Sequence, residues 1–184
     1  MRTHPQAIVL VGPICAGKTT LARNLQGSLQ WQVIVTSSTI ARVSRERGLP
    51  ESRRTLQDVG FELATVHCRR FARMLLEDHA WQGGRGLIVD GVRSYELYSA
   101  LELEVAPMPQ RLVYLDLPLD IRIRRARRRD SISTEELVAI EKHPIEAGIR
   151  SMRAASHYVA DATRSPVDLA VDVREWLMTG STGN

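Results

Sequence analysis

The chain has few cysteines and no long apolar run. Its two cysteines among 184 residues, Cys15 and Cys68, are too few for a disulfide framework and have no metal-ligand spacing, so we expect reduced thiols. No apolar run approaches the roughly 18–20 residues of a membrane span, and the early run AIVLV is too short for a secretory signal. We therefore expect a cytoplasmic protein without a membrane partner.

Aromatic residues are also scarce, at 5% of the chain, and they form no platform of aromatics interleaved with basic residues. Proteins that bind single-stranded nucleic acid typically stack bases on such aromatics. A nucleic-acid partner is therefore disfavoured, although the net charge of +4 would suit one.

Lysine is nearly absent, because only Lys18 and Lys142 are lysines among the 25 basic residues. The chain uses arginine almost everywhere else that it needs a positive charge. A lysine at position 18 therefore indicates a requirement for a compact point charge there.

Short apolar segments alternate with helical patterns along the whole chain. The expected strands are 7–12, 32–36, 86–91, 111–118 and 157–163. The expected helices are about 18–29, 38–48, 52–79, 94–104, 119–129, a segment from Thr134, and 165–177. This alternation predicts a three-layer α/β fold, in which a five-stranded parallel sheet has helices on both faces. We expect one domain over 1–178, a flexible tail over 179–184, and an active edge at the carboxyl ends of the strands.

The segment GPICAGKT, residues 12–19, matches the P-loop pattern G-x-x-x-x-G-K-[ST] and lies between a predicted strand and a predicted helix. Its glycines let backbone N–H groups face a β-phosphate, and the following helix adds its positive dipole end. Lys18 brings a charge to the β- and γ-oxygens, and the Thr19 hydroxyl is placed for Mg²⁺. The expected nucleotide-binding residues are Gly12, Pro13, Ile14, Cys15, Ala16, Gly17, Lys18, Thr19 and Thr20. The expected cofactors are ATP and Mg²⁺.

Phosphoryl transfer to a second anionic group requires that both groups are aligned and that the developing charge is neutralised. Three further segments supply cations for this purpose. Arg42 follows the second strand, and Arg93 follows Asp90 at the end of the third. The third segment, 122–129, has six arginines in eight positions, which favours an anionic partner over a solvated surface.

These segments resemble the nucleoside monophosphate kinase family, of which adenylate kinase is a member. GLIVDGVRS is similar to that family's G-[FL]-[IV]-[LI]-D-G-[FY]-P-R, TSSTIAR to its S-T-G-D-x-x-R, and VYLDLPLDIRIRRARRR to its entry to the lid. With the P-loop, the motifs occur in the family's order from residue 7 to about 177. DGVRS and the later EKHPIEAGI and HYVADAT also resemble a branch of small P-loop kinases described as dephospho-CoA kinase-like or adenylate kinase-like.

The resemblance implies a P-loop NTPase fold with an acceptor-binding part over about 37–80 and a short lid over about 119–147. It implies that Arg125 and Arg129 close over the donor phosphates. Asp90 would orient Mg²⁺ through water or hold the P-loop.

On the acceptor side, the resemblance implies that Arg42 and Arg93 grip a phosphate, and that Ser37 and Ser38 border a base or sugar. The chain departs from the family pattern, since Ser38 and Thr39 replace a Gly-Asp pair and Val92 replaces a proline. These departures leave the acceptor's identity open.

The leading hypothesis is thus an ATP-dependent kinase for a small phosphorylated acceptor, a nucleoside or deoxynucleoside monophosphate. One alternative is a nucleic-acid-end kinase or nucleic-acid-binding P-loop ATPase, although no carboxylate base follows the second strand. Another is a nucleotide-binding regulator without transfer activity, which retention of Arg42 and Arg93 disfavours. We expect Glu141, His143 and Glu146 to be surface residues, and the sequence does not define the oligomeric state.

Overall fold

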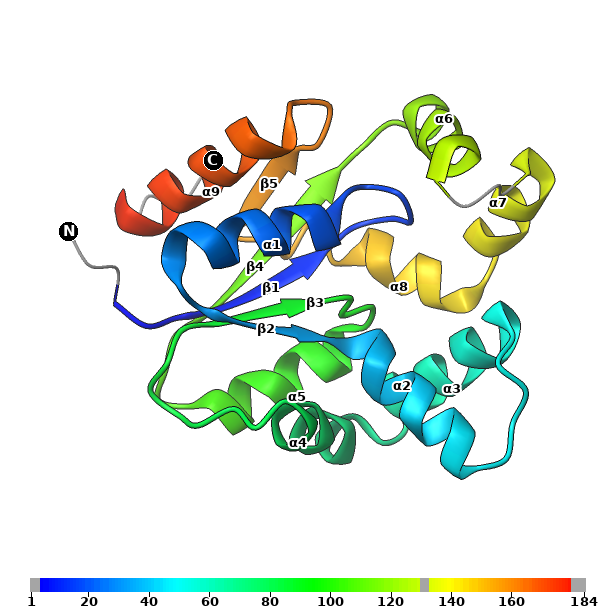
Figure 1. Ribbon diagram of the computed structural model, residues 1–184, viewed down its shortest axis with the longest axis horizontal. Helices are drawn as coiled ribbons and strands as arrows, with labels where there is room; N and C mark the ends of the chain where they lie inside the picture. Colours follow the sequence, from blue (N-terminus) through cyan, green and yellow to red (C-terminus); the bar gives the residue numbers. More distant parts are fainter. Residues whose placement is uncertain (1–3, 130–132, 180–184) are drawn as a thin grey trace.

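The computed structural model describes residues 4–129 and 133–179. At its centre is a parallel sheet with the strand order β2-β3-β1-β4-β5 (Figure 1). The strands are β1 (Ala7–Val11), β2 (Gln32–Val35), β3 (Leu87–Asp90), β4 (Gln110–Asp116) and β5 (Tyr158–Asp161). In register, Val9 of β1 lies opposite Val89 of β3 and Leu112 of β4. The predicted five-stranded parallel sheet is confirmed.

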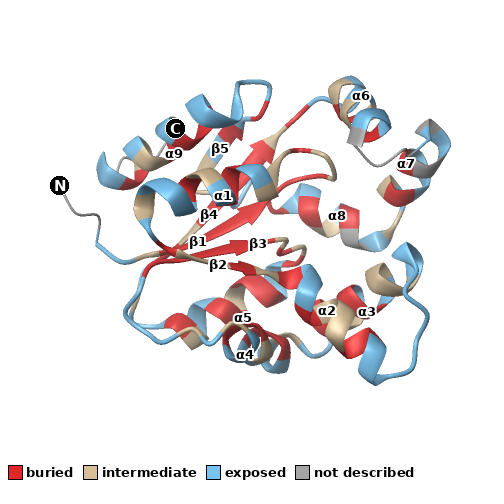
Figure 2. Cartoon of the chain, in the orientation of Figure 1, coloured by how far each residue is buried: buried red, intermediate tan, exposed pale blue. Residues whose placement is uncertain are grey.

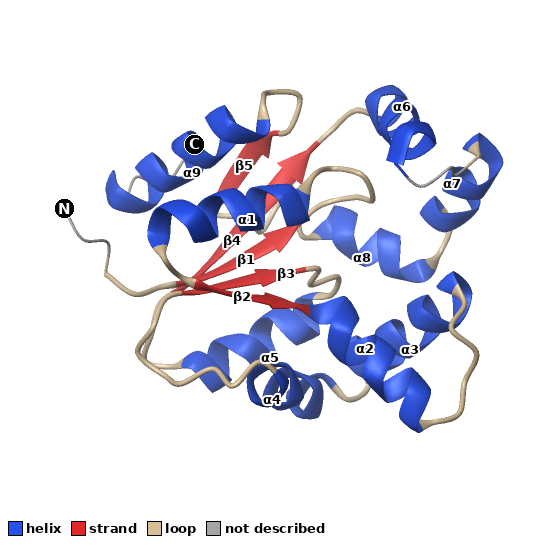
Figure 3. Ribbon diagram, viewed as in Figure 1, coloured by secondary structure: helices blue, strands red, loops and turns tan. Residues whose placement is uncertain are grey.

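Helices connect these strands and cover both faces of the sheet (Figure 3). They are α1 (Lys18–Leu29), α2 (Thr36–Glu46), α3 (Arg53–Thr65), α4 (Cys68–Asp78), α5 (Tyr95–Val105), α6 (Leu119–Arg129), α7 (Thr134–Glu141), α8 (Pro144–Ser151) and α9 (Pro166–Thr179). The predicted tail therefore begins inside α9, and 180–184 lie outside the described residues. In the described part of the chain, no helix has the length and apolar character that crossing a membrane requires.

The sheet separates two hydrophobic cores, because successive side chains of a strand point to opposite faces. On β1, Ile8 and Leu10 pack in the core beneath α1 and α9, whereas Ala7, Val9 and Val11 pack in the core with α4 and α5. All five side chains are fully buried. In Figure 2, β1 and β3 are accordingly buried throughout, and the outer faces of the helices are exposed.

Two predicted helices are each divided in the structure. The segment 52–79 forms α3 and α4, with a break at Val66 and His67, where consecutive residues of low helix propensity follow Thr65. The segment after Thr134 forms α7 and α8, and the second helix starts at Pro144. Proline lacks the N–H that a helix interior needs but suits a first helical position.

A small third core joins the predicted lid to the P-loop. Ala126 of α6 packs with Leu137 and Ile140 of α7, and the partly buried Ile14 and Cys15 pack against them. The helices that follow β4 are therefore in contact with the loop that follows β1. This contact places α6 and α7 over the carboxyl ends of the central strands (Figure 1).

Candidate active site

The P-loop joins β1 to α1 in a tight turn that requires glycine. Gly12 has a φ of 145°, and a Cβ there would lie 2.7 Å from the carbonyl oxygen of Leu115, closer than real Cβ atoms approach. Gly17, with a left-handed φ of 98°, precedes α1 directly and gives that helix no side-chain cap. The first N–H groups of α1 are therefore available to an anion.

The Lys18 ammonium group is held by backbone carbonyls. Its Nζ donates to Gly12 O at 2.6 Å and to Pro13 O at 2.9 Å. Desolvation by burial, followed by the nearby Arg93 guanidinium, lowers the pKa of Lys18 from 10.5 to about 8. The lysine is thus protonated at neutral pH and has no carboxylate hydrogen-bonded to it within the described residues.

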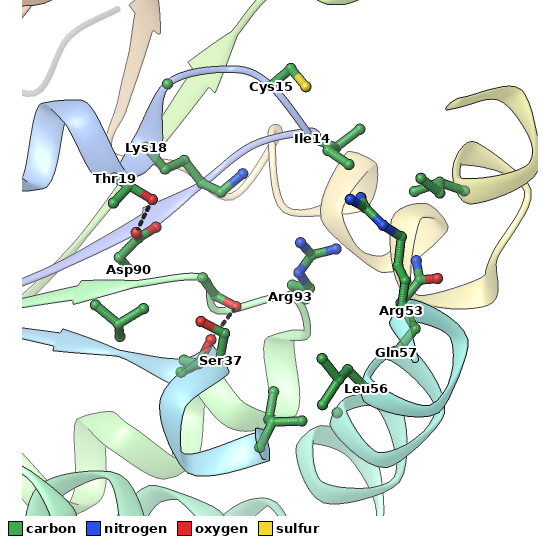
Figure 4. A pocket seen from close by; sticks show the side chains of 17 residues that line it. Ile14, Cys15, Lys18, Thr19, Ser37, Arg53, Leu56, Gln57, Asp90 and Arg93 are labelled. Carbon is green, nitrogen blue, oxygen red and sulfur yellow. Dashed lines mark hydrogen bonds between the residues drawn. The ribbon is translucent and has the colours of Figure 1, made fainter. Parts of the chain in front are cut away.

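Thr19 and Asp90 form an oxygen pair beside this lysine. Thr19 Oγ1 donates to Asp90 Oδ2 at 2.6 Å (Figure 4), and Asp90, the last residue of β3, is only 3% exposed. A hydroxyl and a carboxylate are hard ligands that suit Mg²⁺. The described residues contain no group of three or more histidine, cysteine or acidic residues that could hold a metal ion. The Thr19–Asp90 pair therefore fits a magnesium ion whose other ligands come from phosphate and water.

Two hollows meet at the P-loop. The larger, a cavity of about 480 Å³, extends from the P-loop to the β2–α2 junction, α3 and the loop after β3 (Figure 4). The smaller, about 300 Å³, is lined by the other side of the P-loop, α6 and the loop after β5. Cys15 and Gly17 line both. Below, the larger is called the acceptor-side cavity and the smaller the donor-side hollow.

One wall of the acceptor-side cavity is formed where β2 passes into α2 without a loop. Thr36 Oγ1 donates to Gly91 O at 3.1 Å. A Cβ on Gly91, whose φ is 97°, would lie 2.5 Å from that hydroxyl oxygen, so the approach requires glycine. Ser37 lines the cavity beside Thr36.

Arg93 lines the cavity and is paired with a buried carboxylate. Its Nη1 donates to Glu146 Oε1 at 2.5 Å, and Glu146 is only 1% exposed. Glu146 lies in the first turn of α8, and that helix packs closely enough that a Cβ on Gly148 would lie 3.0 Å from Arg93 O. The expectation that Glu146 is a surface residue is therefore wrong. Glu146 lies among other charged residues in the sequence, and its partner Arg93 lies 53 positions earlier, so the sequence alone did not indicate the pair.

Arg42 and Ser38 are not among the residues that line the cavity. Arg42 Nε donates to Asp78 Oδ2 at 3.0 Å and its Nη1 to Glu46 Oε1 at 2.6 Å, which ties α2 to α4. Ser38 is exposed and donates to Val35 O at 2.7 Å. The structure thus separates both residues from the place that the family resemblance implied for them.

A residue that the sequence analysis missed, Arg53, lines the cavity instead. Arg53, Leu56, Gln57 and Gly60 occupy positions i, i+3, i+4 and i+7 of α3, which form one face of a helix, and all four line the cavity. The helix start is fixed by Ser52, whose Oγ accepts from Thr55 N at 3.1 Å. The sequence signal for this position was the serine that caps the start of the helix. Arg53 could not be distinguished from the other charged residues near it in the sequence.

The arginines of α6 have separate environments. Arg125 Nη1 donates to Ala16 O at 3.3 Å, and its Nη2 donates to Ala162 O at 3.0 Å. Arg122 is buried and pairs with Glu141, so part of the arginine run is neutralised within the protein. Arg128 lines the donor-side hollow. Arg129 ends α6, and its side chain lies outside the described residues.

The family of the chain follows from a family model described as an AAA domain, which matches residues 8–145. The chain belongs to this AAA domain family. The match includes the P-loop, Asp90, Arg93 and the whole of α6. None of the functionally curated proteins compared with the chain matches it.

Solved structures share the fold of this AAA domain. A sugar kinase from Janibacter sp. matches with a TM-score of 0.63 and 17% identity over 95% of both chains. A shikimate kinase from Aquifex aeolicus matches with a TM-score of 0.59 and 18% identity, over 97% of this chain and 100% of the other. An APS kinase from Mycobacterium tuberculosis, in complex with AMPPNP and APS, matches with a TM-score of 0.55 and 16% identity, over 96% of this chain and 99% of the other. The fold is therefore that of small P-loop kinases, and the nucleoside monophosphate kinase subtype is not established.

In this AAA domain, the cationic groups and the Thr19–Asp90 oxygen pair lie between two places where small molecules could enter. Lys18, Thr19 and Asp90 all line the acceptor-side cavity, and Arg125 lines the donor-side hollow. Anionic groups that reached the P-loop from both sides would thus meet beside an ammonium group and the Thr19–Asp90 oxygen pair. Such a meeting point suits transfer of a charged group between two ligands.

Proposed function

We propose that the protein transfers the γ-phosphoryl group of ATP, with Mg²⁺, to a small phosphorylated acceptor, a nucleoside or deoxynucleoside monophosphate. The observation that carries this proposal is that the P-loop is the common wall of two hollows. The nucleotide would occupy the donor-side hollow, with its phosphates in the P-loop. The acceptor would occupy the acceptor-side cavity and reach the γ-phosphate from the opposite side.

On the donor side, the P-loop N–H groups and the start of α1 bind the phosphates, and Lys18 contacts the β- and γ-oxygens. Thr19 and Asp90 would hold Mg²⁺, which would supply further positive charge near the phosphates. Arg125, already next to Ala16 and Ala162, donates to phosphate oxygens as charge develops during transfer. These groups need only hold the reactants in line and stabilise charge.

On the acceptor side, the lining favours a phosphate over an alcohol as the attacking group. A hydroxyl acceptor needs a residue that accepts its proton, usually a carboxylate. Among the described residues of the lining, Asp90 is the only carboxylate, and it already accepts a hydrogen bond from Thr19. The β2–α2 junction supplies hydroxyls, Thr36 and Ser37, and no base. An acceptor phosphate is ionised at neutral pH and needs no base.

The proposal is tested by the release of ADP from ATP·Mg²⁺ in the presence of single acceptors. The panel contains the ribo- and deoxynucleoside monophosphates, dephospho-CoA, shikimate, gluconate and a 5′-hydroxyl oligonucleotide, with Lys18→Ala as the blank. We expect one or a few monophosphates to stimulate release and Lys18→Ala to abolish it. Stimulation only by the oligonucleotide would favour a nucleic-acid-end kinase. Tight ATP binding without release by any acceptor would leave a nucleotide-dependent regulator.

A further inference from the structure

The positive charges of the acceptor-side cavity differ in how much charge they can offer a ligand. Three cationic side chains line it, Lys18, Arg53 and Arg93. Lys18 is held against the P-loop carbonyls, where the donor phosphates would lie. Arg93 is neutralised by Glu146, which is almost completely buried. Arg53 is exposed to the cavity and, within the part of the chain that the structure describes, has no ion pair or side-chain hydrogen bond.

The position of Arg53 is defined by the fold as well as by its charge. It is the first residue of α3, directly after the capping residue Ser52. Leu56 and Gly60 on the same face of α3 line the cavity next to Ile40 of α2, and a Cβ on Gly60 would lie 3.0 Å from Ile40 Cδ1. Figure 4 shows the Arg53 side chain extending from α3 toward the P-loop residue Ile14. A ligand in the cavity would thus lie between an apolar wall and this guanidinium.

We infer that Arg53 is the residue that selects a phosphorylated acceptor over its unphosphorylated counterpart, by donating to the acceptor's phosphate opposite Arg93. The inference rests on the proposed function, and it names the residue that distinguishes a charged acceptor from an uncharged one. Arg42 was expected to do this, but Asp78 and Glu46 hold it outside the cavity. The Arg53 guanidinium is a planar fork that suits bidentate phosphate binding, and no carboxylate among the described residues offsets its charge.

The chain offers a matched control in the neighbouring residue. Arg54 has the same charge, lies on the same helix and is exposed, but it does not line the cavity. Arg53→Ala and Arg54→Ala therefore remove the same charge from the protein at sites one residue apart. Arg53→Lys keeps the charge and removes the fork, and it separates charge from geometry.

The test measures initial rates of ADP formation with AMP, GMP, CMP and dTMP and with the four matching nucleosides, at saturating ATP·Mg²⁺. Loss of a hydrogen bond to a charged group predicts that Arg53→Ala raises KM for the accepted monophosphate by about 10- to 100-fold. We expect the preference over the nucleoside to fall by the same factor and KM for ATP to stay within about twofold. Arg54→Ala should behave as the wild type, and Arg53→Lys should recover part of the loss.

A calorimetric titration of the same monophosphates, without ATP, separates failure of the inference from failure of the proposed function. If the wild type turns over a monophosphate and Arg53→Ala matches Arg54→Ala, the inference is overturned and the kinase proposal stands. If no monophosphate is turned over, the kinase proposal fails. If Arg53→Ala then binds a monophosphate more weakly than both the wild type and Arg54→Ala, Arg53 is still supported as the residue that binds the phosphate. If the wild type binds no monophosphate, both the inference and the kinase proposal are overturned.

Discussion

The P-loop and the walls of the acceptor-side cavity beyond it hold their cations in different ways. At the P-loop, Lys18, which lines the acceptor-side cavity, and Arg125, which lines the donor-side hollow, donate to backbone carbonyl oxygens of the loop and of Ala162. Farther from the loop, the donor-side hollow also has a cation held by a carboxylate, because Arg164 pairs with Asp172. On the acceptor side, Arg93 pairs with Glu146, and the more distant Arg42 pairs with Asp78 and Glu46. Carbonyl groups are dipoles, so a cation that they hold keeps its full charge. A carboxylate cancels that charge for any ligand beyond the first contact.

This difference matches the charges of the two proposed ligands. A nucleoside triphosphate with Mg²⁺ brings several negative charges to one place, and cations held by carbonyls can move to it without leaving a bare carboxylate behind. A buried acid left without its partner would cost several kcal/mol. Beyond the P-loop, the walls of the acceptor-side cavity therefore offer less free charge, and on our inference Arg53 is the main source of selection there. Four predictions test this comparison, from the largest expected effect to the smallest.

Arg125→Ala should lower kcat by about 10²- to 10³-fold, because it removes a donor to charge that develops during transfer. KM for the acceptor should change little, because Arg125 lines the donor-side hollow and not the acceptor-side cavity. Steady-state kinetics with the accepted monophosphate measures both parameters. The matched control is Arg124→Ala, since Arg124 on the same helix is exposed and pairs with Asp120 at 3.2 Å. Similar losses in both variants would show that α6 acts only through its net charge.

ATP affinity should weaken as the pH rises past 8, because Lys18 has a pKa of about 8 in the free protein. Phosphate oxygens favour the protonated lysine, so bound ATP raises the pKa of Lys18 and binding takes up a proton above pH 8. The dissociation constant should therefore rise about tenfold between pH 7 and pH 9. Calorimetry in buffers of different ionisation enthalpy measures the constant and the proton uptake together.

The control for this pH dependence is Lys18→Arg, which stays charged throughout the range. Its ATP affinity should be nearly independent of pH above the ionisation of the terminal phosphate, whatever its absolute value. A pH dependence in Lys18→Arg equal to that of the wild type would assign the titration to another group. The charge on the donor side would then not depend on the carbonyl-held lysine.

Glu146→Gln should increase the affinity for a monophosphate by about 3- to 5-fold, because a carboxylate no longer offsets the positive charge of Arg93. The free energy of unfolding should fall by about 1–3 kcal/mol through loss of a buried ion pair, less than for a fully buried pair because Arg93 is 28% exposed. Calorimetric titration and urea denaturation measure the two effects. Glu141→Gln is the control, because it weakens ion pairs with Arg122 and Arg150, neither of which lines the cavity, and it should lower stability without changing affinity. Unchanged affinity in Glu146→Gln would mean that the pair does not limit the charge of Arg93.

The parts of this molecule that local pattern determines were predictable from the sequence. The strands followed from short apolar runs, and the P-loop from glycines and a lysine at fixed spacing between a strand and a helix. These features depend on residues within about a dozen positions of one another. The two divided helices were less predictable, because a helical repeat continues through a break such as Val66–His67.

The ion pairs that decide the charge of the candidate site were not predictable, because they join residues that are distant in the sequence. Asp78 reaches Arg42 from 36 positions away, and Glu146 reaches Arg93 from 53 positions away. A motif shows that an arginine is present but not whether a carboxylate neutralises it. For that reason the sequence favoured Arg42 as an acceptor residue and passed over Arg53.

Arg42→Ala should have the smallest effect, because its guanidinium lies outside the cavity lining and already has two carboxylate partners. KM for the accepted monophosphate should stay within about twofold of the wild type. The free energy of unfolding should fall by no more than about 1 kcal/mol, since the Arg42 side chain is 36% exposed and exposed ion pairs contribute little. Kinetics and urea denaturation beside Arg53→Ala make the comparison direct. A rise in KM as large as that of Arg53→Ala would mean that Arg42 leaves Asp78 when the acceptor binds. A carboxylate-paired arginine would then be one that changes partner when the acceptor binds. The two sides of the P-loop would then differ in when their cations become available to a ligand, and not in how much charge they can offer.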